Sequence, residues 1–214
     1  MIKAIIFDLD GTLTDSDKVH FQVFKDYFAQ HDIALDHTLY RAKISGRQNV
    51  AILADFLPNL SAAEGEAFSA QKEATFRTKA KGQLTPLPGL PDLLAKLNAQ
   101  NLPAAVVTNA PPENAAFMLS ELGLSTRFHP VIIGDDLPRG KPDPLPYQTA
   151  LDQLGIEGKD AIAFEDSRAG IRSAVGAGIP TVGITTTHTP EELMEVGAFK
   201  AIANFTDPYV QALV

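Results

Sequence analysis

The chain has 214 residues, 45% of them hydrophobic, 21% charged and none cysteine, which is typical of a soluble globular protein and excludes disulfides, thiolate catalysis and cysteine-ligated zinc. Its formal net charge of −8 offers no basic stripe to a phosphate backbone, so we expect no nucleic-acid partner. No apolar run approaches the roughly 20 residues that span a bilayer, so we expect no membrane partner either.

The chain begins MIKAIIFD, which lacks the basic leader, long apolar segment and small-residue cleavage site of a signal peptide. We therefore expect a cytoplasmic protein. Residues 3–7 form a short apolar run that stops at an acidic turn, a pattern typical of a buried parallel strand. In an extended chain Asp8 and Asp10 point the same way, while Leu9 points to the opposite side.

From residue 16 to residue 81 the sequence has helical patterns and no good strand. One helix is indicated by an apolar stripe made of Val19, Val23, Phe24, Tyr27 and Phe28. An amphipathic run over residues 50–57 and a capping box over residues 61–64 predict two more. The proline-rich segment 84–89 then marks a boundary. We therefore predict an all-α cap domain, residues 16–83, inserted into a core made of residues 1–15 and 84–214.

The remainder alternates between apolar runs and helical stripes. Strands are predicted at residues 104–107, 131–133, 161–164 and 181–184, with a weaker candidate at 201–203. Between them, leucine-rich stripes have helical spacing, and two of these end at Gly123 and Gly155. Alternation of this kind favours right-handed crossovers. The predicted fold class is α/β, with a Rossmann-like parallel sheet covered by helices on both faces.

The segment Asp8-Leu9-Asp10-Gly11-Thr12 follows the first predicted strand. Open parallel sheets bind ligands at the carboxyl ends of their strands, and two carboxylates so close need a cation or a proton between them. One carboxylate can attack phosphorus to form an aspartyl phosphate, and the other can exchange protons with the leaving and incoming oxygens. The alternative is an ordinary turn, since turns favour these residue types.

Two polar segments further along the chain can contact a phosphate. Thr108, Asn109 and Ala110 end a predicted strand just before a helix start, where a hydroxyl and free N–H groups suit an anion. Lys141 lies between a glycine and a proline, where it can hold a positive charge over a phosphate. A simple helix cap and an exposed loop lysine are the alternative interpretations.

A third segment is acidic. Glu165 and Asp166 close another apolar run and precede a helix. They can cap that helix, or they can complete an oxygen cage for a hard cation. Magnesium takes one or two carboxylates together with water and substrate phosphate, and this set of residues matches that preference.

In their order and placement these four segments resemble the four motifs of the haloacid dehalogenase-like superfamily, over nearly the whole chain. The resemblance implies that Asp8 is the nucleophile and Asp10 the general acid and base. It implies that Thr108 and Lys141 hold the phosphate. The second aspartate sets the chain apart from the dehalogenases themselves, which lack it, and marks a phosphoryl-transfer enzyme.

The same resemblance implies Mg²⁺ as cofactor, with Asp8, Asp166 and the Asp10 carbonyl as ligands. Glu165 is expected to be a further ligand or to lie just behind the ligands. Asn109 and Ala110 are expected to offer hydrogen-bond donors to the phosphate.

The helical insert resembles the cap of the group that contains phosphoglycolate phosphatase, sugar-phosphate phosphatases and beta-phosphoglucomutase. In that group a histidine placed like His20 and a basic residue in a loop like that of Arg47 serve the sugar phosphate. A surface histidine and a loop-capping arginine are the alternatives. Gly11 and Thr12 continue the first motif in the form that is commoner among phosphatases, which favours a phosphatase over a mutase.

The predicted function is thus a Mg-dependent phosphatase that hydrolyses a small phosphorylated metabolite, a sugar phosphate, through an aspartyl-phosphate intermediate. A beta-phosphoglucomutase-type mutase is the first alternative. A catalytically silent binding or regulatory module is the second, although a decayed site would have lost some of Asp8, Asp10, Lys141 and Asp166. The expected partner is a small-molecule phosphate ester, and the expected state is a monomer or weak dimer.

Overall fold

A computed structural model describes residues 2–213 and contains a six-stranded, fully parallel sheet in the order β3-β2-β1-β4-β5-β6. Its strands are β1 (Ala4–Phe7), β2 (Ala104–Thr108), β3 (Val131–Ile133), β4 (Ala161–Glu165), β5 (Thr181–Ile184) and β6 (Lys200–Ile202). The α/β prediction is confirmed. All six predicted strands are present, and two extend by one residue because Thr108 pairs with β3 and Glu165 with β5.

The central position of β1 determines where the acidic segment lies. All four residues of β1 are buried, and Phe7 pairs with Val106 of β2 on one side and Phe164 of β4 on the other. The continuous apolar run therefore becomes a strand covered on both faces, as parallel sheets require. Asp8 follows at its carboxyl end, between the ends of its two neighbours.

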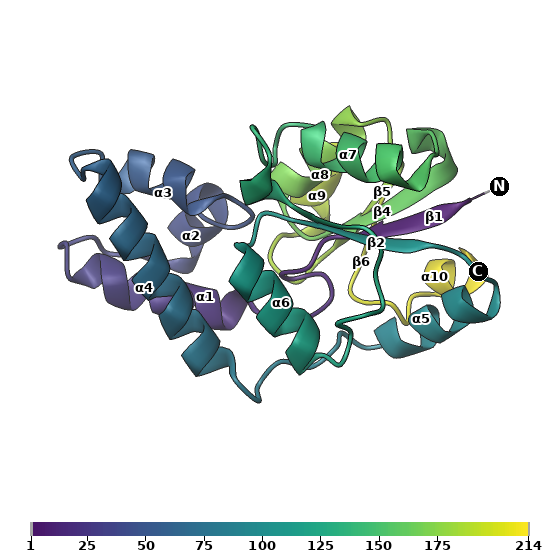
Figure 1. Cartoon of the computed structure of the whole chain (residues 1–214), viewed down its shortest axis with the longest axis horizontal. Helices are drawn as coiled ribbons and strands as arrows, with labels where there is room; N and C mark the ends of the chain where they lie inside the picture. The colour runs from purple at the N-terminus through teal and green to yellow at the C-terminus, as the bar shows by residue number, and fades with distance from the viewer. Residues whose placement is uncertain (1, 214) are drawn as a thin grey trace.

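Helices cover both faces of the sheet (Figure 1). On one side lie α7 (Leu145–Leu154), α8 (Arg168–Gly176) and α9 (Pro190–Glu195), and on the other lie α5 (Leu90–Ala99), α6 (Pro112–Glu121) and α10 (Pro208–Leu213). Short 3₁₀ turns η1 (Gly134–Asp136) and η2 (Gly158–Asp160) complete the connections. Gly155 ends α7 with a φ of 66°, the left-handed conformation that its place after the leucine stripe predicts.

The segment between β1 and α5 is helical and projects beyond one end of the sheet (Figure 1). It contains α1 (Asp17–Ala29), α2 (His37–Lys43), α3 (Asn49–Phe56) and α4 (Ala62–Ala80). The Ser61–Glu64 capping box is formed, with both reciprocal bonds present. The short α2, which the apolar pattern does not reveal, starts at Asp36, whose side chain accepts from Leu39 N at 2.7 Å.

This helical segment, called the cap below, has an apolar cluster of its own that includes Phe24, Phe28 and Ile52. Its two connections to the core are joined to each other, because Thr14 in the first forms a bridge with Pro86 in the second. We propose the predicted division at residues 15/16 and 83/84 as the domain boundary. None of the helices formed by residues 2–213 combines the length and hydrophobicity that crossing a bilayer requires.

Candidate active site

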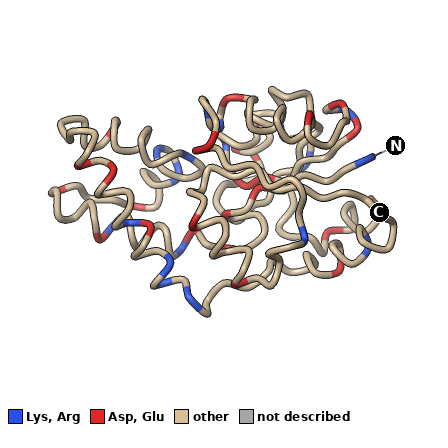
Figure 2. Tube along the Cα trace, viewed as in Figure 1, with Lys and Arg blue, Asp and Glu red and all other residues tan. Residues whose placement is uncertain are grey.

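Three buried carboxylates meet at the carboxyl end of the sheet. Asp8, Glu165 and Asp166 each offer one oxygen within 4.8 Å of the others. The β1–β4 register produces this cluster, since Phe7 opposite Phe164 places the residues that follow them side by side. Acidic residues gather at the same point of the chain trace (Figure 2).

Lys141 is the counter-charge of this cluster. Its Nζ donates to Asp8 Oδ1 at 2.7 Å, to Glu165 Oε1 at 2.5 Å and to the Val107 carbonyl at 2.7 Å. Burial acts to lower the pKa of Lys141, but the adjacent Asp8 and Glu165 outweigh it and raise that pKa above its ordinary value. Lys141 is therefore a fixed positive charge beside Asp8.

The cluster holds more negative charge than one lysine balances. Burial, with the nearby Glu165, raises the pKa of Asp8 to about 7 although Lys141 acts to lower it. Burial and the neighbouring Asp8 and Glu165 raise the pKa of Asp166 well above its ordinary value. Asp8 Oδ2 is buried and has no hydrogen-bond partner among residues 2–213. A set of oxygen donors with a buried, unbonded carboxylate oxygen fits a hard divalent cation.

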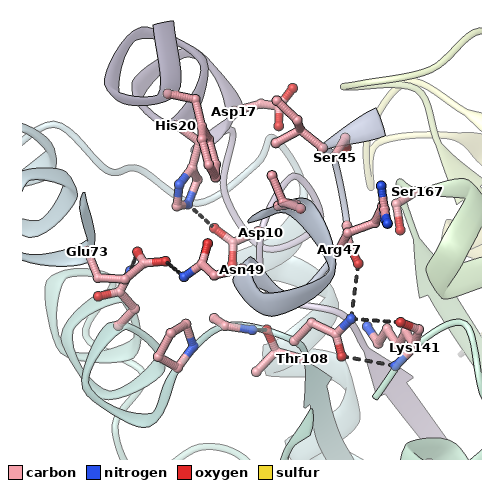
Figure 3. A pocket seen from close by; sticks show the side chains of 18 of the residues that line it. Asp10, Asp17, His20, Ser45, Arg47, Asn49, Glu73, Thr108, Lys141 and Ser167 are labelled. Atoms are coloured by element: carbon pink, nitrogen blue, oxygen red, sulfur yellow. Dashed lines mark hydrogen bonds and ion pairs between the residues drawn. The ribbon is translucent and has the colours of Figure 1, made fainter. Parts of the chain in front are cut away.

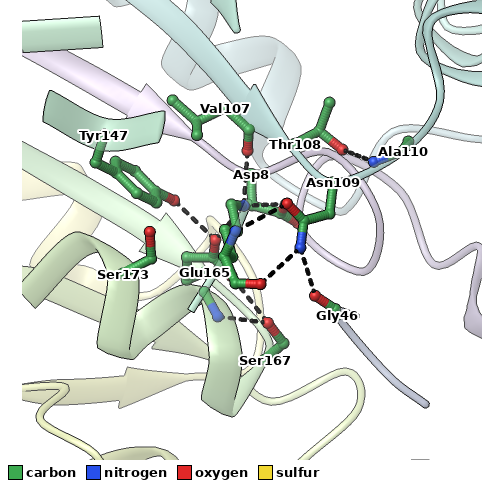
Figure 4. Close-up of polar contacts among 12 residues, drawn as sticks. Asp8, Gly46, Val107, Thr108, Asn109, Ala110, Tyr147, Glu165, Ser167 and Ser173 are labelled. Atoms are coloured by element: carbon green, nitrogen blue, oxygen red, sulfur yellow. Dashed lines mark hydrogen bonds and ion pairs between the residues drawn. The ribbon is translucent and has the colours of Figure 1, made fainter. Parts of the chain in front are cut away.

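Glu165 is bonded from several sides (Figure 4). Besides Lys141, it accepts from the Tyr147 hydroxyl at 2.7 Å and from Ser167 Oγ at 3.3 Å. In this arrangement Glu165 holds Lys141 in place. Sequence reasoning missed Tyr147, because an aromatic residue in a helical stripe is usually read as part of the core.

Asp10 lies in the same pocket, and its side chain is held by the cap side of the site (Figure 3). Ser16 Oγ donates to Asp10 Oδ1 at 2.6 Å, and His20 Nε2 lies 3.0 Å from the same oxygen. Burial acts to raise the pKa of Asp10, but the hydrogen bonds from His20 and Ser16 and the charge of His20 outweigh it, so the pKa is lowered. The three-carboxylate cluster does not include the Asp10 side chain.

The loop after β2 connects the phosphate-binding candidates. Ala110 N donates to Thr108 Oγ1 at 2.9 Å, and Lys141 N donates to Asn109 Oδ1 at 3.0 Å. Asn109 Nδ2 donates to the carbonyls of Lys141 and Gly46, both at 3.1 Å. The structure thus brings all four predicted residues into one pocket wall, with Asn109 linking the lysine loop to the cap (Figure 4).

Arg47 also lines the pocket, but its guanidinium is bonded within the cap. Nη1 donates to the Lys43 carbonyl at 2.7 Å and to Asp55 Oδ2 at 2.9 Å, and Nη2 donates to the Ala51 carbonyl at 3.2 Å. These bonds tie together the loop between α2 and α3. A substrate would have to compete with Asp55 for the same donors.

Two buried charges of α4 were not predicted. Lys72 and Glu73 are paired at 2.7 Å, and Lys72 Nζ lies 3.5 Å from His20 Nδ1. The sequence carried a signal for Lys72, because it stands four residues from both Phe68 and Phe76 and so falls on an apolar stripe. A lysine in such a stripe needs a partner inside the protein, and Glu73 is that partner.

The resulting pocket has a volume of about 80 Å³ and is lined by both the core and the cap. It combines a buried carboxylate, a fixed cation beside it, a second carboxylate hydrogen-bonded to a histidine, and oxygen donors suited to a metal. That inventory fits displacement at phosphorus.

The family profile of haloacid dehalogenase-like hydrolases matches residues 2–178. The chain is 35% identical over 195 residues, 91% of each chain, to validoxylamine A 7'-phosphate phosphatase of Streptomyces hygroscopicus subsp. limoneus. It is 32% identical over 192 residues, 86% of this chain and 83% of the relative, to beta-phosphoglucomutase of Bacillus subtilis (strain 168).

A solved structure shares the architecture. CbbY from Rhodobacter sphaeroides, in complex with phosphate, superposes with a TM-score of 0.85 at 28% identity, covering 97% of this chain and 96% of that one. The predicted resemblance to the haloacid dehalogenase-like superfamily is therefore confirmed. The chain belongs to the haloacid dehalogenase-like hydrolases and is a phosphoric monoester hydrolase.

Proposed function

We propose that the protein is a Mg²⁺-dependent phosphatase that hydrolyses a sugar phosphate through an aspartyl phosphate on Asp8. The observation that carries the proposal is the state of that side chain. One oxygen of Asp8 is held by Lys141 at 2.7 Å, and the other is buried without a hydrogen-bond partner among the described residues. A carboxylate held in this way presents an oriented oxygen to phosphorus.

The reaction has two steps. In the first, an Asp8 oxygen forms a bond to phosphorus while the bond from phosphorus to the leaving oxygen breaks, and Asp10 gives that oxygen a proton. In the second, Asp10 removes a proton from water, which attacks the aspartyl phosphate and releases phosphate and Asp8. The second step needs Asp10 ionised, and its lowered pKa favours that form. The first step needs Asp10 protonated, and the negative charge of a bound phosphate favours that form.

Lys141 and Thr108 are proposed to hold the phosphoryl oxygens, with Asn109 and Ala110 shaping the loop that carries them. Asp8 and Asp166 would hold Mg²⁺, with the Asp10 carbonyl and Glu165 as further predicted contributors. The bound cation would neutralise carboxylate and phosphate charge in a site that now depends on protons and one lysine for that purpose.

The cap supplies the proposed contacts to the rest of the substrate. His20 is placed to position Asp10, since it lies 3.0 Å from that carboxylate and stacks on Phe76 with ring centroids 3.8 Å apart. Arg47 is proposed to bind the substrate by giving up its ion pair with Asp55 and contacting the substrate instead. Two further relatives support a sugar-like substrate, namely a phosphorylated carbohydrates phosphatase of Thermotoga maritima (28% identical) and hexitol phosphatase A of Escherichia coli (30% identical).

Phosphate release from a panel of sugar phosphates, phosphoglycolate and nucleotides, with Mg²⁺ and then with chelator, tests the proposal. We expect metal-dependent release concentrated on sugar phosphates. No release, but conversion of beta-glucose 1-phosphate to glucose 6-phosphate with a bisphosphate primer, would identify a mutase. If the protein showed neither phosphate release nor mutase activity, the result would identify a binding module.

A further inference from the structure

A second, much larger depression adjoins the catalytic pocket. It has a volume of about 920 Å³ and runs between α3 and α4 of the cap and the start of α6 in the core. Figure 1 shows α4 and α6 side by side along this boundary. We call this depression the cap groove. Its apolar wall includes Val50, Leu53, Leu57, Leu60 and Leu137.

The cap groove adjoins the catalytic pocket and shares a wall with it. Four residues line both spaces, namely Asn49, Glu73, Pro111 and Asp135. The catalytic pocket, at about 80 Å³, is far smaller than the cap groove and smaller than the several hundred cubic ångströms that are typical of ligand pockets. A substrate larger than a single small sugar therefore has to extend past these four residues.

Hydrogen bonds between amides and carboxylates cross this junction. Asn49 Nδ2 donates to Glu73 Oε1 at 2.7 Å, and Asn114 Nδ2 donates to Glu73 Oε2 at 2.5 Å. Gln48 Nε2 donates to Asp135 Oδ1 at 2.6 Å, linking cap and core. A hydroxyl both donates and accepts, so hydroxyl groups of a ligand can replace these bonds without leaving a buried group unpaired.

The charges of the cap groove restrict what can occupy it. Its ionisable residues are Glu66, Glu73, Glu113 and Asp135, against the single cation Arg77. Glu73 is balanced by Lys72, which leaves the groove with an excess of negative charge. An anionic group would be repelled here, whereas a neutral or amine-bearing group would not. The exposed Val50 and the leucines add an apolar surface on which the face of a ring can pack.

We propose that the cap groove is a second substrate subsite, which binds the distal, uncharged or amine-bearing ring of a two-ring phosphate monoester whose phosphoryl group lies at Asp8. This deepens the proposed function and rests on it. The phosphorylated ring occupies the catalytic pocket, the hydroxyl-rich link between the rings passes Asn49 and Glu73, and the second ring packs against the leucines of α3.

Gly65 provides the means to block the subsite. It lines the cap groove on α4, and a Cβ at this position would lie 3.6 Å from Leu53 Cδ1, an ordinary contact. Gly65→Trp should therefore fold and fill the groove. Ala63→Trp is the matched control, since it puts the same bulk at an exposed position of the same helix outside the groove.

Kinetics with paired substrates test the proposal, beginning with trehalose 6-phosphate and glucose 6-phosphate and continuing through other disaccharide phosphates. We expect the wild type to prefer the two-ring member of at least one pair. Gly65→Trp should raise KM for that member about tenfold or more while leaving the one-ring member and p-nitrophenyl phosphate unchanged. Ala63→Trp should change neither. An equal effect of Gly65→Trp on both members, or no two-ring preference in any pair, would overturn the subsite.

Binding without turnover separates this proposal from the proposed function. Calorimetric titration of the Asp8→Asn variant with the same pairs measures affinity whether or not the wild type is a phosphatase. Tighter binding of the two-ring ester, lost in the Asp8→Asn/Gly65→Trp double variant, would support the subsite even if hydrolysis failed. Equal affinity for both members would contradict the subsite even if hydrolysis succeeded.

Discussion

The backbone carbonyl of Gly46 in the cap accepts a hydrogen bond from Asn109 Nδ2 in the core at 3.1 Å. Gly46 has a φ of 72°, and a Cβ there would overlap the side chain of Ser167 on the opposite side of the pocket. The cap loop therefore rests against the core only because this residue has no side chain. The cap loop thus contacts the core beside the catalytic pocket, which both line.

Gly46→Ala should hinder the approach of the cap loop to the core. We expect kcat/KM for sugar phosphates to fall by about tenfold or more, because the added methyl group meets Ser167 when the cap closes. Steady-state kinetics measure the loss. Gly82→Ala is the matched control, since Gly82 has a φ of 70° with nothing within 4 Å of its Cβ and so shares the backbone strain without the clash. Equal losses in both variants would assign the effect to strain.

Asp8→Asn should abolish turnover while the fold is retained. An asparagine is nearly the same size and can still accept from Lys141, but it cannot attack phosphorus as a carboxylate does. We expect kcat to fall by about a thousandfold or more, with a melting temperature close to that of the wild type. Near-normal turnover would remove Asp8 as the nucleophile.

Magnesium should stabilise the protein more at high pH than at low pH. The pKa of Asp8 is raised from 3.8 to about 7, so the folded state binds the extra proton, and the associated stability is lost as the pH rises through 7. A cation can replace that proton. The pKa of Asp166 is also raised, so the same argument applies to its carboxyl group. Thermal unfolding with and without Mg²⁺ should show a larger increase in melting temperature at about pH 8 than at about pH 5. An increase independent of pH would contradict this account.

Arg47 and Asp55 offer a paired test of the cap loop. Arg47→Ala should raise KM for sugar phosphates more than for p-nitrophenyl phosphate, because it removes a bidentate donor from the pocket wall. Asp55→Ala should leave that KM unchanged or lower it, because it frees the guanidinium from its 2.9 Å partner. A parallel rise in both variants would show that the Arg47–Asp55 pair serves only to hold the loop.

The sequence was most informative where one short segment determines the structure. The apolar run before Asp8, the capping box at Ser61 and the glycine after α7 each depend on local chemistry, and each has the predicted form. The strand order could not be read in the same way. It depends on which strands pair, and the central place of β1 is a result of those pairings.

The orientation of cap side chains was equally beyond sequence reasoning. A helical stripe shows that α4 has an apolar face, but not that Lys72 on that face lies beside His20. The guanidinium of Arg47 is a similar case, because its partner Asp55 is eight residues away and is brought near only by the turn into α3. Their roles toward substrate remain predictions.

The bridge between Thr14 and Pro86 places the two ends of the cap side by side. An insertion whose ends lie together can be replaced by a short linker without shifting the strands on either side, so it forms a separate module. Lengthening, shrinking or exchanging this module would alter which molecules are admitted while the chemistry beneath it stays the same. Substrate specificity can thus change in evolution through changes in this one inserted segment.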